Sequence, residues 1–339
     1  MKKVLVTAII ASMTFSHSLA FAWNAEGHQT VGAIAEHLIQ NSKAGARVKA
    51  ILGDTSLEKI SVWADCAKGI APDKDFSYTS TGRYPECAPF ETAAGIAEMA
   101  DFVKRNNTQC NPANGEETCH KQYHYTNIDF KHQHYHLGPV GTSDHDIVHA
   151  IQAAVLFLQG KAVPAPFSFQ NEREALALLT HYLGDLHQPL HVGSVYLDQD
   201  GKIVHPEPAN YDKSTHTVGG NALQCPCGNF HSLWDDIPGH LKRGKQTEAL
   251  VNKARLIPKT DGSVASWSEQ WASQTMAQAR LAFAKTEYSP ASAAGAGRGN
   301  NWSIGLPLAY EKTMANMKED ALVRGGAHLA ELLQAIWPE

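Results

Sequence analysis

Residues 176–191, LALLTHYLGDLHQPLH, combine a helical pattern with residue types that bind metals. Four leucines recur at the spacing of one helix face: Leu176, Leu179, Leu183 and Leu186. Pro189 is expected to end this helix. His181 and Asp185 are four residues apart and share one face, and His191 can swing back toward it from the following turn. The segment predicts two imidazoles and a carboxylate directed toward one region.

Other segments show apolar residues at helical spacing and few residues that favour strands: 31–38, 147–158, 265–284 and 309–336. Short strand patterns occur at 123–128 and 192–197. Polar loops separate the helices: 71–92, 106–122, 198–230 and 286–303. The Ala/Gly/Ser stretch 291–299 is expected to be flexible. The sequence predicts an all-α fold: one mostly helical domain over residues 23–339, with long loops and at most a small β-hairpin.

The chain has 339 residues, of which 43% are apolar and 19% charged, and its formal net charge is −5. This ordinary globular composition excludes collagen-like, coiled-coil and intrinsically disordered chains. Because the net charge is negative, the protein as a whole does not attract nucleic acid. An anionic ligand therefore needs a local site that supplies positive charge. The 18 histidines are unusually many, and metal binding is the first explanation for them.

Residues 1–22 have the pattern of a secretory signal peptide that is cleaved from the mature protein. Two lysines precede an apolar stretch over 4–15, and Ala20-Phe21-Ala22 provides a cleavage site. Cleavage would leave Trp23 as the first residue. No later stretch is apolar for long enough to span a membrane. The sequence therefore predicts a secreted or periplasmic protein without stable membrane association.

The cysteines suggest disulfides, because an even number remains in an exported chain. They are Cys66, Cys87, Cys110, Cys119, Cys225 and Cys227. Short loops favour pairing Cys66 with Cys87 and Cys110 with Cys119. Cys225 and Cys227 would then form a small strained ring or remain free. A cysteine zinc site is the alternative, but the spacing lacks two CxxC motifs.

A second His/Asp pair, His231 and Asp235, repeats the four-residue spacing within NFHSLWD, residues 229–235. One such pair on a helix is most often a capped or salt-bridged pair at the surface. Two pairs, together with His191 after the proline, are much less expected by chance. Their combination favours a metal site.

Candidate ligands also occur in distant segments of the chain. After cleavage, the free α-amino group and carbonyl oxygen of Trp23 can chelate a metal together with His28. Asp65, within the triplet WAD, offers a carboxylate, and Lys68 follows three residues later. His124, within HYTNID, offers another imidazole, although alone it would be better explained as an interior histidine with satisfied hydrogen bonds.

Six motifs in this order resemble the S1/P1 nuclease family of trinuclear zinc nucleases. They are W-x4-H from Trp23, WAD-x2-K from Trp63, HYTNID from His124, H-x3-D-x5-H from His181, GGN from Gly219 and H-x3-WD from His231. The resemblance runs from Trp23 to about Asp235, and we find no matching motif beyond it. It implies a mostly helical catalytic domain of the type that phospholipase C and P1 nuclease share.

The resemblance implies three Zn²⁺ ions, held by nitrogen and oxygen ligands only. Asp65, His124, His181 and Asp185 would hold one zinc. Trp23 and His28 would hold a second, with Asp185 bridging the two ions. His191, His231 and Asp235 would hold the third. Such a ligand set, with room for water, suits catalytic rather than structural zinc.

The implied activity is that of a hydrolase: an endonuclease that cleaves single-stranded DNA and RNA to 5′-phosphorylated products and acts on nucleotides as a 3′-nucleotidase. Hydroxide generated between two zincs would attack phosphorus, and the third zinc would stabilise the leaving 3′ oxygen. Asp65, Asp185 and Lys68 are the expected catalytic residues, and Lys68 would also neutralise phosphate charge. Tyr125 and Asn127 are expected to contact the base, although Tyr125 equally suits ordinary packing. We expect a monomer.

Two other functions remain open. A zinc-dependent phospholipase C shares the metal cage, but that family has a longer gap between the terminal Trp and the first His and a Glu at the position of Asp235. A non-enzymatic periplasmic zinc-binding protein would take up zinc without turnover. His187 and three alternating histidines match no ligand of the family and are expected in supporting or surface positions: His132, His134 and His136.

Overall fold

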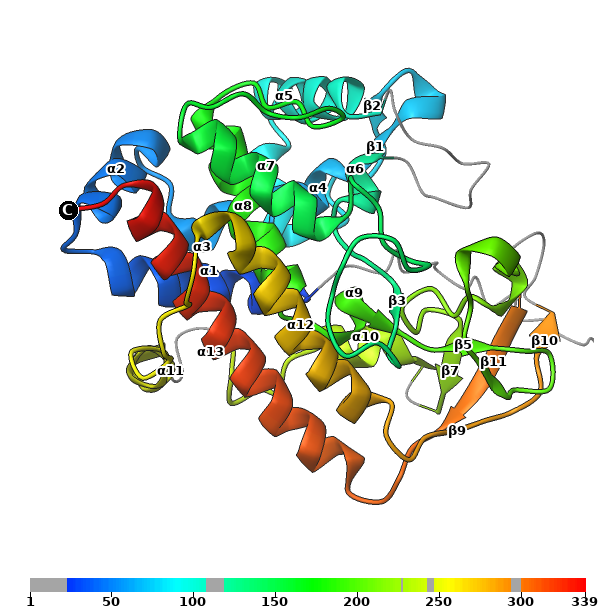
Figure 1. The fold of residues 1–339 in the computed structure, drawn as a ribbon. Coiled ribbons are helices and arrows are strands. Elements are labelled where there is room, and N and C mark those ends of the chain that lie inside the picture. The colour runs from blue at the N-terminus through cyan, green and yellow to red at the C-terminus, as the bar shows by residue number, and fades with distance from the viewer. Residues whose placement is uncertain (1–22, 108–118, 227, 243–246, 294–299) are drawn as a thin grey trace, which may run out of the picture.

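The computed structural model describes residues 23–107, 119–226, 228–242, 247–293 and 300–339. At its core α8 (Glu172–Leu186) packs against α1 (Ala25–Ile39), α7 (Ile147–Leu158) and α13 (Tyr310–Ile336) (Figure 1). Every residue of α8 from position 174 onward is buried. A helix buried on all its faces lies inside the bundle rather than on its surface, so the polar residues of α8 are enclosed by protein.

The long helices lie where the apolar periodicity predicts them, which confirms the mostly helical fold. The remaining helices are α2 (Lys43–Leu52), α3 (Leu57–Ile60), α4 (Trp63–Ala67), α5 (Ala93–Arg105), α6 (Cys119–Gln122), α9 (Pro189–Val192), α10 (Phe230–Asp235), α11 (Thr247–Ala254) and α12 (Val264–Ala282). α8 ends before Pro189, as expected, and this proline begins α9. The first helical position tolerates proline because its missing N–H would have no partner within the helix.

Asparagine side chains cap three of the helices that carry candidate site residues. The side-chain oxygens of Asn24, Asn171 and Asn229 each accept a hydrogen bond from the amide three residues later, at 3.1, 2.9 and 3.1 Å. They precede α1, α8 and α10 respectively. Each cap satisfies an amide that has no partner within its helix, and so helps to fix where the helix begins.

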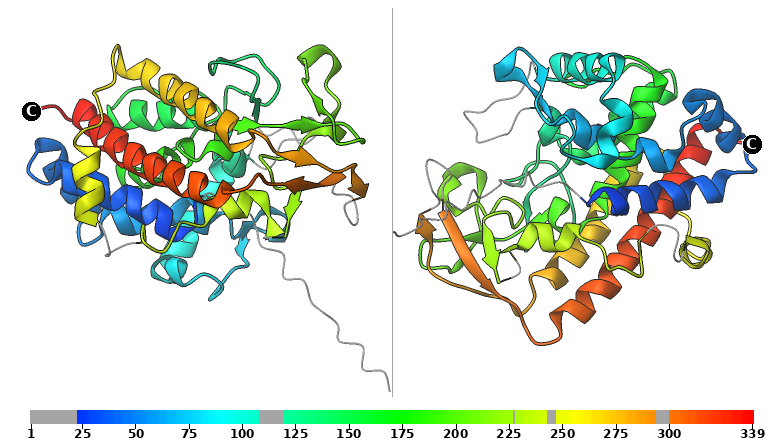
Figure 2. Two further views of the ribbon diagram at one scale, coloured as in Figure 1. Left: turned by 90° about the horizontal axis from the view of Figure 1, so that it is seen from below. Right: turned by 180° about the vertical axis from the view of Figure 1, so that it is seen from behind.

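Most of the strands gather at one end of the helical body (Figure 2). A five-stranded sheet contains β7 (Leu223–Cys225), β8 (Gly228–Asn229), β9 (Glu287–Tyr288), β10 (Ser292–Ala293) and β11 (Asn300–Gly305). Three two-stranded pairs are β1 (Ile70–Ala71) with β2 (Ser77–Tyr78), β3 (Ile128–Asp129) with β4 (Gly193–Ser194), and β5 (Tyr196–Leu197) with β6 (Ile203–Val204).

This β-structure exceeds the small hairpin that the sequence predicts. β11 runs parallel to β7, with Trp302 opposite Leu223, so these strands pair across a long stretch of chain. Strand formation depends on such neighbours more than on local propensity, and a local pattern therefore did not reveal it. Part of the stretch expected to be flexible forms β10, and residues 294–299 of that stretch lie outside the described residues.

A disulfide joins Cys66 to Cys87 with a Cα–Cα distance of 5.6 Å, which confirms the first expected pair. Cys119 and Cys225 are also disulfide-bonded, so Cys225 is not free. Cys110, Cys227 and the expected signal peptide lie outside the described residues. Among the helices that the structure describes, we find none with the length and apolar character needed to cross a membrane.

Candidate metal centre

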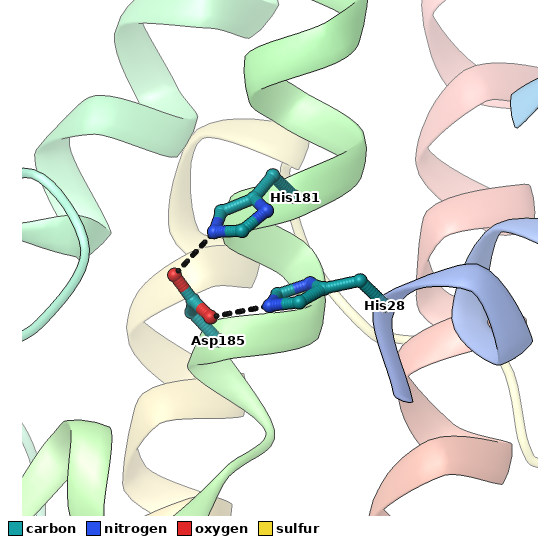
Figure 3. A group of neighbouring side chains, drawn as sticks. All are labelled: His28, His181 and Asp185. Atoms are coloured by element: carbon teal, nitrogen blue, oxygen red, sulfur yellow. Dashed lines mark ion pairs between the residues drawn. The ribbon is translucent and has the colours of Figure 1, made fainter. Parts of the chain in front are cut away.

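The carboxylate of Asp185, near the end of α8, faces two imidazoles, with one oxygen directed to each (Figure 3). Its Oδ1 is 3.2 Å from His28 Nε2 of α1, and its Oδ2 is 3.2 Å from His181 Nε2, one turn earlier in α8. The two imidazole rings stack with their centroids 3.8 Å apart. These three residues form the first cluster. All three are fully buried, so a charge placed here needs a partner in the protein or a bound cation.

Gly184 allows α1 and α8 to approach this closely. A Cβ at this position would lie 2.7 Å from His28 Nδ1, which is too close for a real contact. The carbonyl of Gly184 also accepts a hydrogen bond from Trp23 Nε1 at 2.9 Å. The segment that begins at Trp23 is thereby held against the turn of α8 that carries His181 and Asp185.

His181 also belongs to a second cluster, formed with Asp65 of α4 and with His124, which follows α6. His181 Nε2 lies 3.0 Å from His124 Nδ1 and 3.5 Å from Asp65 Oδ1. His124 Nδ1 is 2.9 Å from Asp185 Oδ2, so the first and second clusters adjoin through one carboxylate. Lys68 Nζ lies 2.8 Å from Asp65 Oδ1 and brings a positive charge to this part of the site.

The third cluster consists of His191 from α9 and of His231 and Asp235 from α10. The Nε2 atoms of the two histidines are 3.1 Å apart, and His231 Nε2 is 3.6 Å from Asp235 Oδ2. Asp235 Oδ1 accepts a hydrogen bond from Gln188 Nε2 at 2.8 Å. His191 Nδ1 lies 4.0 Å from Asp185 Oδ1, which places the third cluster beside the first.

Backbone carbonyls orient three of the imidazoles. The Nδ1 atoms of His181, His191 and His231 donate to the carbonyls of residues 61, 124 and 219, at 2.6, 2.7 and 2.6 Å. In a neutral imidazole this leaves Nε2 as an acceptor. The two Nε2 atoms 3.1 Å apart in the third cluster are then both acceptors. Two facing acceptors need a proton or a cation between them, and this orientation is typical of metal-binding histidines.

Burial favours neutral imidazoles in much of the site. It lowers the pKa of His231 to about 3 and also lowers the pKa values of His28 and His191. Neutral imidazole is the form that binds metal. For His181, burial acts in the same direction, but neighbouring carboxylates raise its pKa overall. Burial raises the pKa of Asp235, and a bound cation would favour the charged form of that carboxylate.

Several buried polar atoms of the first cluster make no hydrogen bond among the described residues: both ring nitrogens of His28 and Asp185 Oδ1. His28 Nε2 and Asp185 Oδ1 are 3.2 Å apart and form an ion pair only if the imidazole is protonated. Buried polar atoms are normally hydrogen-bonded, and an exception suggests a missing ion or water. Together with the facing acceptors of the third cluster, these atoms fit a site built for metal cations.

The sequence over residues 23–338 matches the model of the family described as S1/P1 Nuclease. The chain belongs to the S1/P1 nuclease family. Nuclease P1 from Penicillium citrinum and Nuclease PA3 from Penicillium sp are each 25% identical to it over 220 residues. The matched region covers 63% of this chain and 57% of each relative.

In this member of the S1/P1 nuclease family, the three clusters contain eight of the predicted ligands: His28, Asp65, His124, His181, Asp185, His191, His231 and Asp235. Trp23, the ninth predicted ligand, is fully buried. Its indole Nε1 donates a hydrogen bond to the carbonyl of Gly184, the residue before Asp185. The fold thus brings together side chains from α1, α4, α8, α9 and α10, and from the segment after α6. Their binding of metal stays a prediction.

The two predicted base contacts flank the clusters. Tyr125, next to His124, is half-buried, and its hydroxyl donates to Gln122 Oε1 at 3.1 Å. Asn127 is 5% exposed, and its Oδ1 would lie 3.1 Å from a Cβ at Gly219. Since the Gly219 carbonyl accepts from a histidine of the third cluster, Asn127 lies at the edge of that cluster. Contact of either residue with a base stays a prediction.

His187 and the three alternating histidines lie outside the three clusters, as the sequence suggests. The alternating histidines are in an irregular segment without helix or strand: His132, His134 and His136. His187 Nδ1 donates to Leu183 O at 2.7 Å, and its Nε2 lies 2.7 Å from His328 Nδ1. His187 therefore supports the end of α8.

The sequence did not indicate several residues that hold the predicted ligands in place. Gln188 fixes the carboxylate of Asp235, and Gly184 makes room for His28. Asn24 N donates to Asp235 O at 2.9 Å and joins the amino-terminal segment to α10. The position of Asn24 before a helical stretch signals a cap, but nothing local signals a contact with a segment so distant in the chain.

Proposed function

We propose that this member of the S1/P1 nuclease family is an exported, zinc-dependent endonuclease. It would hydrolyse phosphodiester bonds of single-stranded DNA and RNA to 5′-phosphorylated products and act on nucleotides as a 3′-nucleotidase. The observation that carries the proposal is the pair of imidazole acceptors 3.1 Å apart beside the buried Asp235. The adjoining clusters add further buried imidazoles and carboxylates in the same region. Family membership supports nuclease activity.

Zinc suits the donor set, because imidazoles and carboxylates with room for water are the ligands of catalytic zinc. The proposed ligands of three Zn²⁺ are Trp23, His28, Asp65, His124, His181, Asp185, His191, His231 and Asp235. When bound, zinc supplies Lewis-acid chemistry that lowers the pKa of water and stabilises negative charge on phosphate oxygens.

The chain itself would orient the ligands and provide charge for the substrate. The carbonyls that hold the imidazoles keep their acceptor nitrogens directed into the site. Lys68 lies beside Asp65, and its ammonium would help to neutralise the phosphate of the substrate. Because the net charge of the whole chain is −5, the positive charge for a polyanion is proposed to be concentrated at this site.

Burial of the clusters favours a single strand over a duplex. The residues of the third cluster are at most 5% exposed, and those of the first are fully buried. A flexible strand can bend toward such a site and stack a base on an aromatic ring, whereas the phosphates of a stiff duplex cannot. Tyr125 is proposed to offer that ring, and Asn127 a hydrogen bond to the base.

Cleavage of the signal peptide is part of the proposed assembly of the metal site. Removal of residues 1–22 would free the α-amino group of Trp23, whose indole Nε1 donates to the carbonyl of Gly184, the residue before Asp185. An amide nitrogen within an unprocessed chain is a poor metal ligand, so cleavage would complete the site. We propose a secreted or periplasmic monomer whose single catalytic domain spans residues 23–339.

Hydrolysis of heat-denatured DNA by the purified mature protein, with and without a chelator, tests this function. We expect activity that the chelator abolishes and added Zn²⁺ restores, with much slower cleavage of native duplex. Phosphatidylcholine in a parallel reaction tests the phospholipase alternative. Zinc uptake without turnover of any of these substrates would contradict the proposal and favour a zinc-binding protein.

Metal removal is also expected to destabilise the folded protein. A ligand that binds only the folded state adds about 2.7 kcal/mol when its free concentration is 100 times its Kd. We therefore expect thermal unfolding of the chelator-treated protein at a temperature several degrees lower, and recovery when zinc is added. Calorimetry checks this, and an unchanged unfolding temperature would argue against zinc in these buried clusters.

A further inference from the structure

The C-terminal helix α13 carries a buried lysine, Lys318, that contacts the end of α10, the helix that carries two residues of the third cluster. Lys318 is 2% exposed, and its Nζ donates to Leu233 O at 2.6 Å and also to Asp236 O. Burial lowers its pKa to about 8, which still leaves the ammonium mostly protonated at neutral pH. Burial of a charge is unfavourable unless its hydrogen bonds are satisfied, so the two carbonyls are its required partners.

These two carbonyls lie on either side of Asp235 in the chain. They belong to the end of α10, where backbone carbonyls have no partner within the helix. Lys318 Nζ also lies 5.9 Å from the centre of the Trp234 ring. The ammonium therefore holds the backbone before and after the residue whose carboxylate faces His231.

The same turn also holds the segment that carries Trp23. Asp235 O accepts a hydrogen bond from Asn24 N at 2.9 Å, and Asp236 Oδ1 accepts one from Asn24 Nδ2 at 3.1 Å. A displacement of this turn would therefore move both the third cluster and Trp23. Asp65 of the second cluster lies on α4 and does not depend on the turn.

We propose that Lys318 is a positioning residue for two of the metal sites: it holds the end of α10, from which Asp235 reaches the third site and to which the Trp23 segment is attached. This inference rests on the proposed zinc sites and deepens them by adding a residue of the C-terminal helix. Residues that support metal ligands without touching the metal typically change metal affinity by about 10- to 100-fold.

Zinc titration of the metal-free mature protein against a coloured competing chelator tests this role without substrate. Lys318→Met keeps the length and apolar stem of the side chain but removes the ammonium. Lys312→Met is the matched control, because Lys312 lies on the same helix and is exposed. We expect three zinc sites of unchanged affinity in the control. In Lys318→Met we expect two sites to weaken by about 10- to 100-fold while the remaining site keeps its affinity.

Thermal unfolding of the metal-free variants separates positioning from general stability. Wild-type zinc affinities in folded Lys318→Met would overturn the proposal, as would equal weakening of every site. If Lys318→Met does not fold, Lys318→Gln, which keeps a polar donor, and Lys318→Arg, which keeps a cation, enter the same titration. We then expect the Arg variant to bind zinc more tightly than the Gln variant, and equal affinities would contradict the role of the charge. Fewer than three zinc ions in the wild type would instead contradict the proposed function.

Discussion

Asp185→Asn is expected to lower the rate of single-strand hydrolysis by about 10³-fold or more, because metal stabilisation of charge is worth several kcal/mol and each 1.4 kcal/mol is a factor of ten. The carboxylate of Asp185 contacts His28, His124 and His181. A neutral amide offers one oxygen and cannot bridge two cations as a carboxylate does. Steady-state rates on denatured DNA at saturating zinc, together with zinc content, measure the effect.

Asp146→Asn is the matched control for loss of a buried carboxylate. Asp146 is also fully buried, but it caps α7 and accepts a hydrogen bond from the Tyr135 hydroxyl at 2.7 Å. Asparagine is a good helix cap, so we expect this variant to keep three zinc ions and a rate within a few-fold of wild type. A wild-type rate in Asp185→Asn would contradict the bridging role of Asp185.

One glycine added before Trp23 of the mature chain is expected to reduce bound zinc from three ions to two and to lower the rate by about 10²-fold or more. The extension converts the α-amino group of Trp23 into an amide, which cannot serve as an amine ligand. Zinc analysis and rates on denatured DNA check this result. Three bound ions and an undiminished rate in the extended protein would show that the chain terminus is not a ligand.

Trp23→Phe in a correctly processed chain separates the amino group from the indole. This variant keeps the free α-amino group but loses the hydrogen bond from Trp23 Nε1 to Gly184 O. A buried acceptor that loses its partner costs about 1–3 kcal/mol. We expect lower stability with three zinc ions still bound, a pattern opposite to that of the glycine extension.

Most of the helical architecture can be predicted from the sequence because it depends on local periodicity. The helices α8, α12 and α13 can each be recognised from the spacing of their own apolar residues. The five-stranded sheet is different. Its pairing of Trp302 with Leu223 joins distant segments. Four of its five strands have only two or three residues, which carry too little local pattern to be recognised.

The candidate ligands could be singled out from the sequence because their spacing and residue types repeat a known set of motifs, and the fold brings eight of them together in three clusters. The residues that hold the ligands could not, since their roles arise only in the folded chain. Gln188 reaches a carboxylate of α10, and Lys318 reaches carbonyls more than eighty residues away along the sequence. In the sequence, one is an ordinary glutamine before a proline and the other an ordinary lysine in an amphipathic helix.

Anomalous diffraction at the zinc edge from crystals of the mature protein tests the central claim most directly. Three buried metal ions, held by α1, α4, α8, α9, α10 and the segment after α6, should give three peaks. Each peak should lie about 2.0–2.2 Å from its predicted nitrogen and oxygen ligands. Fewer than three peaks, or strong peaks away from the three clusters, would contradict the account.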